Sequence, residues 1–196
     1  GSTAVAVQKK FGKLGGSLDA VGQKAGKMLA VGAAAGGVAL FKMTQAAAED
    51  DLAQRKLADT LTKGAGATQA QIAQTEAWIS AQGKATGVTD DELRPALSRL
   101  AAATKDVDEA QRLASLGMDV AAGRGVSLKS VTDALAKAQN GSMGGLSRLG
   151  VNIKKANGET KSLDQVTKEL AQTYGGAAAN AADTTAGRQK ILTTRL

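Results

Sequence analysis

The sequence contains no cysteine and no histidine. A chain without cysteine forms no disulfide and no thiolate metal site, and its composition fits a reducing compartment. A chain without histidine lacks the side chain that most often acts as a general base at neutral pH and most often binds metals. These two absences weigh against an enzyme and against a transition-metal site.

Aromatic residues and proline are also scarce. The aromatic residues are Phe11, Phe41, Trp78 and Tyr174, and the one proline is Pro95. Low proline content favours long helices, and alanine, about a fifth of the 196 residues, is the best intrinsic helix former. Because alanine buries little apolar area, we predict a mostly α-helical chain whose helices pack thinly and gain stability from partners or oligomerisation.

The positive charge is concentrated at the start of the chain. The net charge is +7, and residues 1–48 carry six lysines against one acid, whereas the remainder is nearly balanced at +2. The simplest interpretation is a solubilising lysine face on an apolar segment, and the alternatives are binding to an anionic membrane surface or to nucleic acid. Beyond residue 48 the basic residues are scattered and no aromatic residues interleave with them for base stacking. We therefore predict no sequence-specific nucleic-acid binding.

Residues 1–45 form a basic, apolar segment rich in glycine and alanine. Within it, Met28–Phe41 has 14 uncharged residues between Lys27 and Lys42. As a helix this run would be about 21 Å long, too short to span alone a hydrocarbon core of roughly 30 Å. Glycines four residues apart let two helix backbones approach closely. The candidate residues for membrane insertion or helix packing are Met28, Leu29, Gly32, Gly36, Leu40 and Phe41.

The rest of the chain is expected to fold in three parts. Residues 46–67 are predicted to form a helical linker, residues 68–176 a compact domain of short helices, and residues 177–196 the start of a further helix that leaves the domain. The predicted fold is thus a long N-terminal helical segment followed by a small helical bundle. The initial Gly1-Ser2 is typical of an expression remnant, and we expect the chain to be a piece of a longer protein.

Capping signatures mark the predicted helices of the domain. They are Thr68 with Gln71, Thr89 with Glu92, and Ser162 with Gln165. In each, a hydroxyl accepts from a free backbone amide while the later side chain reaches back to the cap. Asp106 and Ser127 are predicted to begin two further helices with apolar stripes. Proline is tolerated in the first turn of a helix, but Pro95 lies beyond the first turn counted from Thr89. We therefore expect a short turn after Thr89 and a main helix that begins near Pro95.

One non-helical feature is predicted within the domain. Asn157-Gly158 accepts positive φ at both turn positions, and it lies between Val151–Lys154 and Glu159–Ser162. This pattern is typical of a β-hairpin. We therefore expect one β-hairpin near Asn157-Gly158 in an otherwise helical domain.

No motif in the sequence supports a catalytic or cofactor site. The Gly-Lys of Gly22–Lys27 is followed by Met28, where a phosphate-binding loop needs Ser or Thr. The acidic clusters Asp90–Glu92 and Asp106–Glu109 lie at predicted helix starts, where carboxylates complement the helix dipole, and they lack calcium-loop spacing. We therefore predict no catalytic residue, no cofactor and no metal ligand. We expect the Trp78 side chain to be buried at the centre of a small hydrophobic core, as its anchor.

Several stretches, taken in order, resemble the bacteriophage tail tape measure proteins. The stretches are Thr86–Thr104, Asp106–Leu116, Val120–Gly141, Leu146–Ile153 and Tyr174–Gly187. The resemblance covers about residues 86–192. The segment before Gln45, which consists of small residues with interspersed lysines, is also similar to an apolar stretch common in these proteins.

The resemblance implies a structural role. Tape measure proteins are long, largely helical chains in the lumen of the phage tail tube, and their length sets the number of tube rings. They contact the tail tube protein, tail-tip proteins and tail assembly chaperones, and they leave the tube at infection to assist genome ejection. The resemblance thus implies a virion tail protein that passes through the host cytoplasm during assembly, with self-association as a further expectation. We expect residues 86–176 to be a folded module before assembly or at one end of the ruler.

Two other functions remain open. Residues 12–42 would act as a membrane-active helical segment if they inserted in the host membrane during DNA entry. The basic, glycine-rich start also permits a secreted helical effector or toxin fragment. The ordered family-like stretches favour the tape measure assignment over this last alternative.

Overall fold

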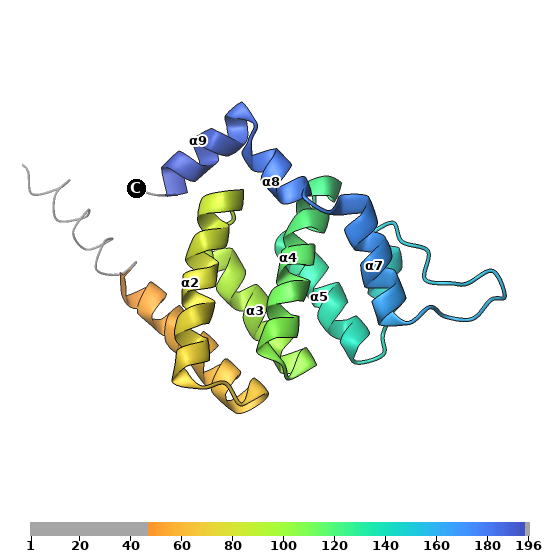
Figure 1. Ribbon diagram of the computed structural model, residues 1–196, viewed down its shortest axis with the longest axis horizontal. Helices are drawn as coiled ribbons and strands as arrows, with labels where there is room; N and C mark the ends of the chain where they lie inside the picture. The colour runs from red at the N-terminus through yellow and green to blue at the C-terminus, as the bar shows by residue number, and fades with distance from the viewer. Residues whose placement is uncertain (1–46, 195–196) are drawn as a thin grey trace, which may run out of the picture. The chain divides into compact units, whose positions relative to one another are not determined.

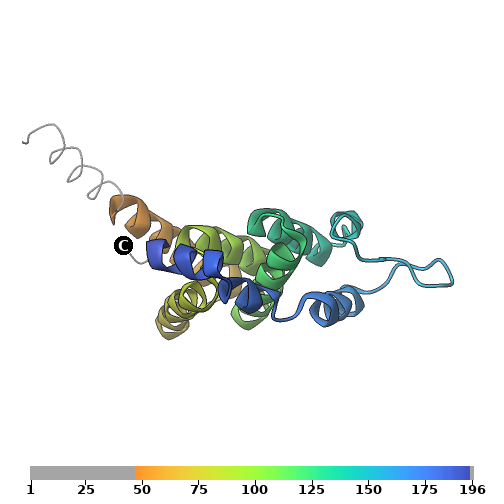
Figure 2. The ribbon, with the colours of Figure 1, turned by 90° about the horizontal axis from the view of Figure 1, so that it is seen from above.

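The structure, a computed structural model, describes residues 47–194 (Figures 1 and 2). Of these residues 77% are helical, which confirms the predicted mostly-α fold. By its internal contacts the chain divides into two units, Gly1–Glu49 and Asp50–Leu196. Nearly all of the described residues belong to the second unit.

The described residues form a first helical stretch, residues 47–65, and a series of named helices. These are α2 (Gln69–Thr86), α3 (Asp90–Thr104), α4 (Val107–Arg124), α5 (Leu128–Gln139), α6 (Gly144–Ser147), α7 (Leu163–Tyr174), α8 (Ala177–Ala182) and α9 (Thr185–Thr194). In the second unit α3 packs against α4 and α5, and α2 lies against α3. Helix α4 also contacts α7 and α8, and Figure 1 shows α8 and α9 in blue turning back from α7 toward α2.

The predicted helix caps form. Thr68 Oγ1 accepts from the Gln71 amide at 3.3 Å, while the Gln71 side chain accepts from the Thr68 amide at 2.9 Å. Ser162 and Gln165 repeat this arrangement at the start of α7, and Asp106 accepts from a first-turn amide of α4 at 2.8 Å. These bonds satisfy amides that the first turn of a helix leaves free. The starts of these helices therefore follow from local sequence.

Helix α3 differs from its prediction at Pro95. The helix runs without interruption from Asp90 to Thr104, so the expected short turn and the later start near Pro95 are wrong. Pro95 lies on the exposed face of the helix. Proline has no N–H to donate to the carbonyl of Asp91, and on this face water can hydrogen-bond to that carbonyl instead. Buried Leu93 and Leu97 hold the helix on both sides of the proline.

The predicted β-hairpin near Asn157-Gly158 is not supported, and the residues from 47 to 194 contain no strand. The turn itself forms, with Gly158 at φ 86°, but the pairing is a single antiparallel bridge between Lys154 and Thr160. Val151 and Ile153 before the turn are partly buried against the core, but residues 159–162 after it are polar and mostly exposed, so the second side of the turn has no apolar face to extend the ladder. The segment is instead a loop, coloured cyan, that extends away from the helices in both views (Figures 1 and 2).

Two segments predicted to lie outside the domain contribute to the packed unit. The region 46–67, predicted as a linker, places Leu57 and Leu61 in the core with no exposed surface. Complete burial of one leucine stabilises by about 1.5–3 kcal/mol, which holds this helix against the others. The C-terminal region, predicted to leave the domain, turns back so that α8 packs on α4. There the Ala178 amide donates to Asp119 Oδ1 at 3.0 Å.

The core is built from aliphatic side chains. Among the described residues, 28 hydrophobic residues are buried, of which nine are alanine and none is aromatic. Trp78 is partly buried and packs against the edge of the core rather than anchoring it, as does Tyr174. Twelve of the buried residues are leucine, so most of the buried apolar area comes from larger aliphatic side chains, and the thin packing expected from the alanine content stays a prediction.

Candidate functional site

The residues selected for membrane insertion or helix packing lie outside the described residues. They are Met28, Leu29, Gly32, Gly36, Leu40 and Phe41. Within residues 47–194 no helix combines the length and the apolar character that crossing a membrane requires. The role of the N-terminal segment therefore stays a prediction from sequence.

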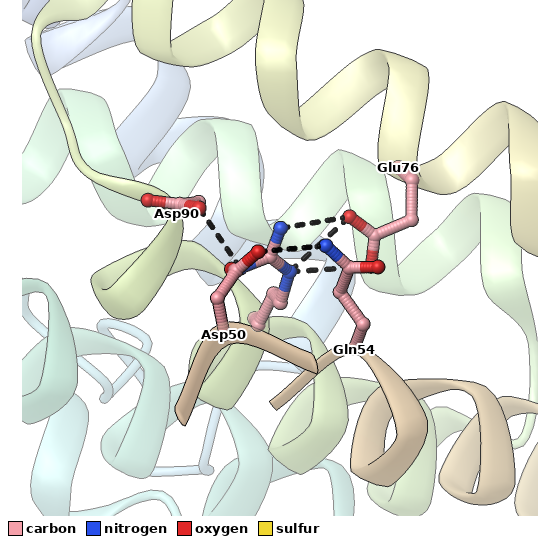
Figure 3. Close-up of polar contacts among 5 residues, drawn as sticks. Asp50, Gln54, Glu76 and Asp90 are labelled. Atoms are coloured by element: carbon pink, nitrogen blue, oxygen red, sulfur yellow. Dashed lines mark hydrogen bonds and ion pairs between the residues drawn. The ribbon is translucent and has the colours of Figure 1, made fainter. Parts of the chain in front are cut away.

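A polar cluster surrounds Arg94 of α3, whose side chain is 7% exposed. Its Nε and Nη2 donate to Glu76 on α2 at 3.1–3.2 Å. Its Nη1 donates to Asp90, one turn earlier on α3, and to Asp50 of the first helical stretch. Gln54 donates to Asp50 at 2.9 Å. Figure 3 shows these side chains converging from separate segments, with dashed lines along the contacts.

Burial and charge act on Arg94 in opposite directions. Desolvation is the largest single effect and disfavours the charged guanidinium. The hydrogen bond to Glu76 and the charges of Glu76, Asp50 and Asp90 together exceed it and raise the pKa of Arg94 above its ordinary value. Arg94 is therefore always charged, and its planar fork suits simultaneous contact with several carboxylates. Three carboxylates face one guanidinium, so the cluster keeps an excess of negative charge.

The Arg94 cluster has the chemistry of a structural clamp. Arginine does not give up its proton in proteins, so it cannot act as a general acid or base. The part of the chain that the structure describes contains no group of three or more metal-ligating side chains placed to hold an ion. Because the three carboxylates come from residues 47–65, α2 and α3, the Arg94 side chain joins these three segments.

Sequence reasoning missed this role of Arg94. It predicted only that the Asp90 carboxylate interacts favourably with the helix dipole. Asp90 and Arg94 are, however, four residues apart, a spacing that brings opposite charges together on one helix face. The other partners, Glu76 and Asp50, lie 18 and 44 positions away. No local pattern identifies contacts at such separations.

The second acidic cluster has the capping role predicted for it. Asp106 caps α4, and Glu109 in the first turn contacts Arg112 at 2.7 Å. The hydrogen bond to Glu109 is the main reason that the pKa of Arg112 is raised. These acids therefore stabilise the start of α4.

A smaller ion cluster joins α3 and α5. Asp133 contacts Arg99 of α3 at 3.0 Å and Lys129, one turn earlier on α5, at 2.8 Å. The hydrogen bond from Lys129 is the largest cause that lowers the pKa of Asp133; desolvation opposes it, and the charge of Arg99 adds to it. Asp133 is thus held as a carboxylate between two cations.

A cleft of about 340 Å³ adjoins the Arg94 cluster, between α2, the start of α3 and α9. Its apolar lining residues include Ile79, Val88 and Ile191. Its charged lining residues are Glu76, Asp90, Lys84 and Arg94, two carboxylates and two cations, so the lining carries no net charge. Its volume lies at the lower end of the range of about 300–1,000 Å³ typical of ligand pockets.

A second cleft, of about 400 Å³, lies on the other side of Val88. Side chains from the ends of α2 and α4 and from α8 and α9 line it, and most of them are small, such as Ala121 and Ala182. The charged residues in its lining are Glu92 and Lys190. Its lining favours packing of apolar groups rather than chemistry.

Comparison of the chain with protein family models, with curated proteins and with solved structures finds no match. Similarity to a known protein therefore assigns neither the fold nor the Arg94 cluster to a family. A functional assignment has to rest on the residues of this chain and on the arrangement that its helices give them.

Proposed function

We propose that this chain is a structural segment of a phage tail tape measure protein. The observation that supports the proposal is the ordered run of family-like stretches from Thr86 to Gly187. This run includes α3 to α8, most of which pack directly on α4. The resembling run therefore lies within the packed unit Asp50–Leu196.

The proposed role is to determine tail length. A continuous helix rises about 1.5 Å per residue, so chain length converts directly into distance, and 196 residues would reach about 290 Å. The packed unit is then the state before assembly, and it opens into a continuous helical path as the tube forms around it. Opening exposes a core that contains twelve buried leucines, so contacts with the tube have to replace that burial.

The partners follow from the same proposal. In the host cytoplasm the chain binds a tail assembly chaperone, and in the virion it lies in the lumen of the tail tube against the tail tube protein and tail-tip proteins. Copies of the chain associate with one another along the tube. At infection the chain leaves the tube and assists genome ejection.

The composition of purified tails tests this function. Mass spectrometry of intact tails, from the phage that encodes the chain, should recover its peptides in amounts comparable to those of other tail proteins. The same peptides should be depleted from tails that have ejected their contents. Absence of the chain from intact tails, with abundant chain in the same lysate, would contradict the proposal.

Membrane activity during DNA entry is a second candidate function. The uncharged run from 28 to 41 and the basic character of residues 1–48 support it. Flotation of the full chain with anionic lipid vesicles tests it. The wild type and the Leu52→Asp control, which alters an already exposed side chain, should float, whereas a variant combining Leu29→Asp and Leu40→Asp should not. A wild-type chain that stays with the protein fraction would exclude this function.

A further inference from the structure

Two asparagines of the chain are followed by glycine, Asn140 by Gly141 and Asn157 by Gly158. The side-chain amide of an asparagine can be attacked by the backbone nitrogen of the next residue. Glycine permits the closest approach, because it has no Cβ and adopts φ and ψ values that other residues avoid. Both pairs are therefore candidates for spontaneous deamidation, and the structure distinguishes them by the way each side-chain amide is held.

The Asn140 side chain is bound to the end of α5. Its Nδ2 donates to the carbonyl of Ala136, one turn earlier, at 3.3 Å. The backbone amides of Gly141 and Ser142 also donate into the last turn, each at 2.9 Å. These bonds direct the side chain back along the helix and hold the Gly141 nitrogen, so both reacting groups are restrained.

The Asn157 side chain is held in the opposite direction, over the glycine that follows it. Its Oδ1 accepts from the backbone amide of Glu159 at 3.1 Å, which folds the side-chain carbonyl over the peptide bond to Gly158. Its Nδ2 donates to the Glu159 carboxylate at 2.9 Å. When the side-chain carbon is attacked, negative charge develops on Oδ1, and the N–H that already donates to this oxygen stabilises that charge.

The loop around Gly158 allows its nitrogen to react. The Gly158 N–H donates to the carbonyl of Lys155 at 3.0 Å and has to release this bond. Residues 154–160 are all exposed, and the two sides of the loop pair through the single bridge between Lys154 and Thr160. Opening of such exposed backbone costs much less free energy than global unfolding. The Gly158 nitrogen thus becomes available while the helices stay folded.

We propose that Asn157 is a self-modification site, at which the Gly158 nitrogen converts the side-chain amide into a carboxylate through a cyclic imide. The nitrogen gives its proton to solvent and forms a bond to Asn157 Cγ. The Cγ–Nδ2 bond then breaks, and the side-chain nitrogen takes a proton from solvent and leaves as ammonia. Water opens the imide at either of its carbonyls, which yields aspartate or isoaspartate. Water is the one co-reactant, and no atom is oxidised or reduced.

The modification changes the loop and not the helical unit. The Nδ2 donor that contacts Glu159 is lost, and the new carboxylate repels the carboxylate of Glu159. Isoaspartate also routes the main chain through the former side chain, which lengthens the turn and shifts Lys154 relative to Thr160. The loop therefore gains negative charge and loses its bridge as the protein ages. This proposal is independent of the tail function proposed above.

The experiment measures conversion at both asparagines in the folded full chain, incubated warm at mildly alkaline pH. Pepsin digestion at acidic pH, followed by liquid chromatography and mass spectrometry, separates peptides that carry asparagine, aspartate and isoaspartate. Asn157 should convert at least about tenfold faster than Asn140, because only its side chain is positioned over the attacking nitrogen. In concentrated guanidinium chloride, which removes the restraints on both, the two rates should agree within about threefold.

Two variants identify the attacking group. Gly158→Ala adds a Cβ next to the nitrogen and should slow conversion of Asn157 at least about tenfold. Gly141→Ala is the matched control and should leave conversion of Asn157 unchanged. The two glycines have φ of 86° and 88°, and a Cβ at either would meet nothing within 4 Å, so the two variants carry similar backbone strain.

Four outcomes would overturn the proposal. Asn140 that converts as fast as Asn157 in the folded chain would show that the loop confers no reactivity. Asn157 that converts in guanidinium chloride but not in the folded chain would show that the bond from Gly158 to Lys155 protects it. An equally large preference for Asn157 in guanidinium chloride would assign the difference to local sequence and not to the fold. An unchanged rate in Gly158→Ala would indicate attack by water.

Discussion

Arg94 on α3 and Glu76 on α2 form a forked ion pair in which Nε and Nη2 of one guanidinium donate to one carboxylate at 3.1–3.2 Å. The side chains are 7% and 26% exposed. Because water has little access to this ion pair, removal of either side chain leaves the other charge poorly solvated and destabilises the fold. Asp50 extends the same contact to the first helical stretch, so one side chain joins three segments.

Substitution of Arg94 should therefore be costly. Arg94→Ala is expected to lower the free energy of unfolding by about 3 kcal/mol, because it removes a buried stem and leaves three carboxylates without their cation. Arg94→Lys should lose less, since an ammonium keeps the charge but cannot make the forked contact. Urea unfolding followed by circular dichroism measures both losses.

The control for Arg94 is Arg55, which pairs with Asp51 on the exposed face of the first helical stretch. Arg55→Ala should cost less than about 0.5 kcal/mol, because exposed pairs four residues apart contribute little. Similar losses at Arg94 and Arg55 would show that the Arg94 cluster is not a clamp.

Asp133 makes stability depend on pH in the acid range. Its pKa in the folded protein is lowered, chiefly by the hydrogen bond from Lys129. Its contribution is therefore complete above the pKa of the unfolded chain, about 4, and is lost as the pH falls through the lower folded value. The free-energy difference between the wild type and Asp133→Asn should be larger at about pH 6 than at about pH 2.

Urea unfolding of both chains at the two pH values measures the effect of Asp133. Asp183→Asn, which alters a side chain that is 84% exposed, serves as the control and should show no such trend. A wild-type advantage over Asp133→Asn that grows on acidification would contradict the lowered pKa.

Gly123 lies inside α4 against the ring of Tyr174. A Cβ at this position would collide with Cδ1 of the ring. Gly123→Ala, which would stabilise an unhindered helix by about 0.5–1 kcal/mol, is therefore expected to destabilise the chain by about 1–2 kcal/mol. Thermal unfolding measures the change.

Two further variants decide whether the ring is the cause of the Gly123 effect. Gly144→Ala is the matched control, because nothing lies within 4 Å of its Cβ, and it should be neutral or stabilising. Tyr174→Leu should reduce the penalty of Gly123→Ala when the two are combined. An unchanged penalty in the double variant would show that another contact is responsible.

Pro95 interrupts the hydrogen bonding of α3 without ending the helix. Pro95→Ala restores one backbone bond on an exposed face and should stabilise the chain by about 1 kcal/mol, less than the full interior cost of proline because the proline also restricts the unfolded chain. Pro95→Gly, which restores the amide without the helix propensity of alanine, should be about 1 kcal/mol less stable than Pro95→Ala. Destabilisation by Pro95→Ala, measured by urea unfolding, would contradict this account of the helix.

The sequence predicts the local features of the fold well. Helix starts at Thr68, Asp106 and Ser162 follow from side chains within three residues of the amides that they cap. The stop of α5 at Asn140-Gly141 follows in the same way. Each of these features depends on one turn of chain, and the chemistry that determines it is contained in a few consecutive residues.

Features that depend on contacts between distant residues could not be predicted from short stretches of sequence. The Asn157-Gly158 pair that predicted a β-hairpin correctly located a turn, but strand pairing also needs an apolar face on both sides of the turn, and residues 159–162 lack one. Leu57 and Leu61 lie in the region predicted as a helical linker, and only the packing of the other helices shows that they are buried. The Arg94 cluster likewise depends on contacts over 18 and 44 positions.

Tail length tests the central claim most directly. The phage that encodes the chain would carry an in-frame deletion of residues 89–173, which removes 85 residues, or about 130 Å of continuous helix. Electron microscopy should show tails shorter by about that amount, and an in-frame duplication of the same residues should lengthen them equally. Viable tails of unchanged length would contradict a length-determining role for this unit.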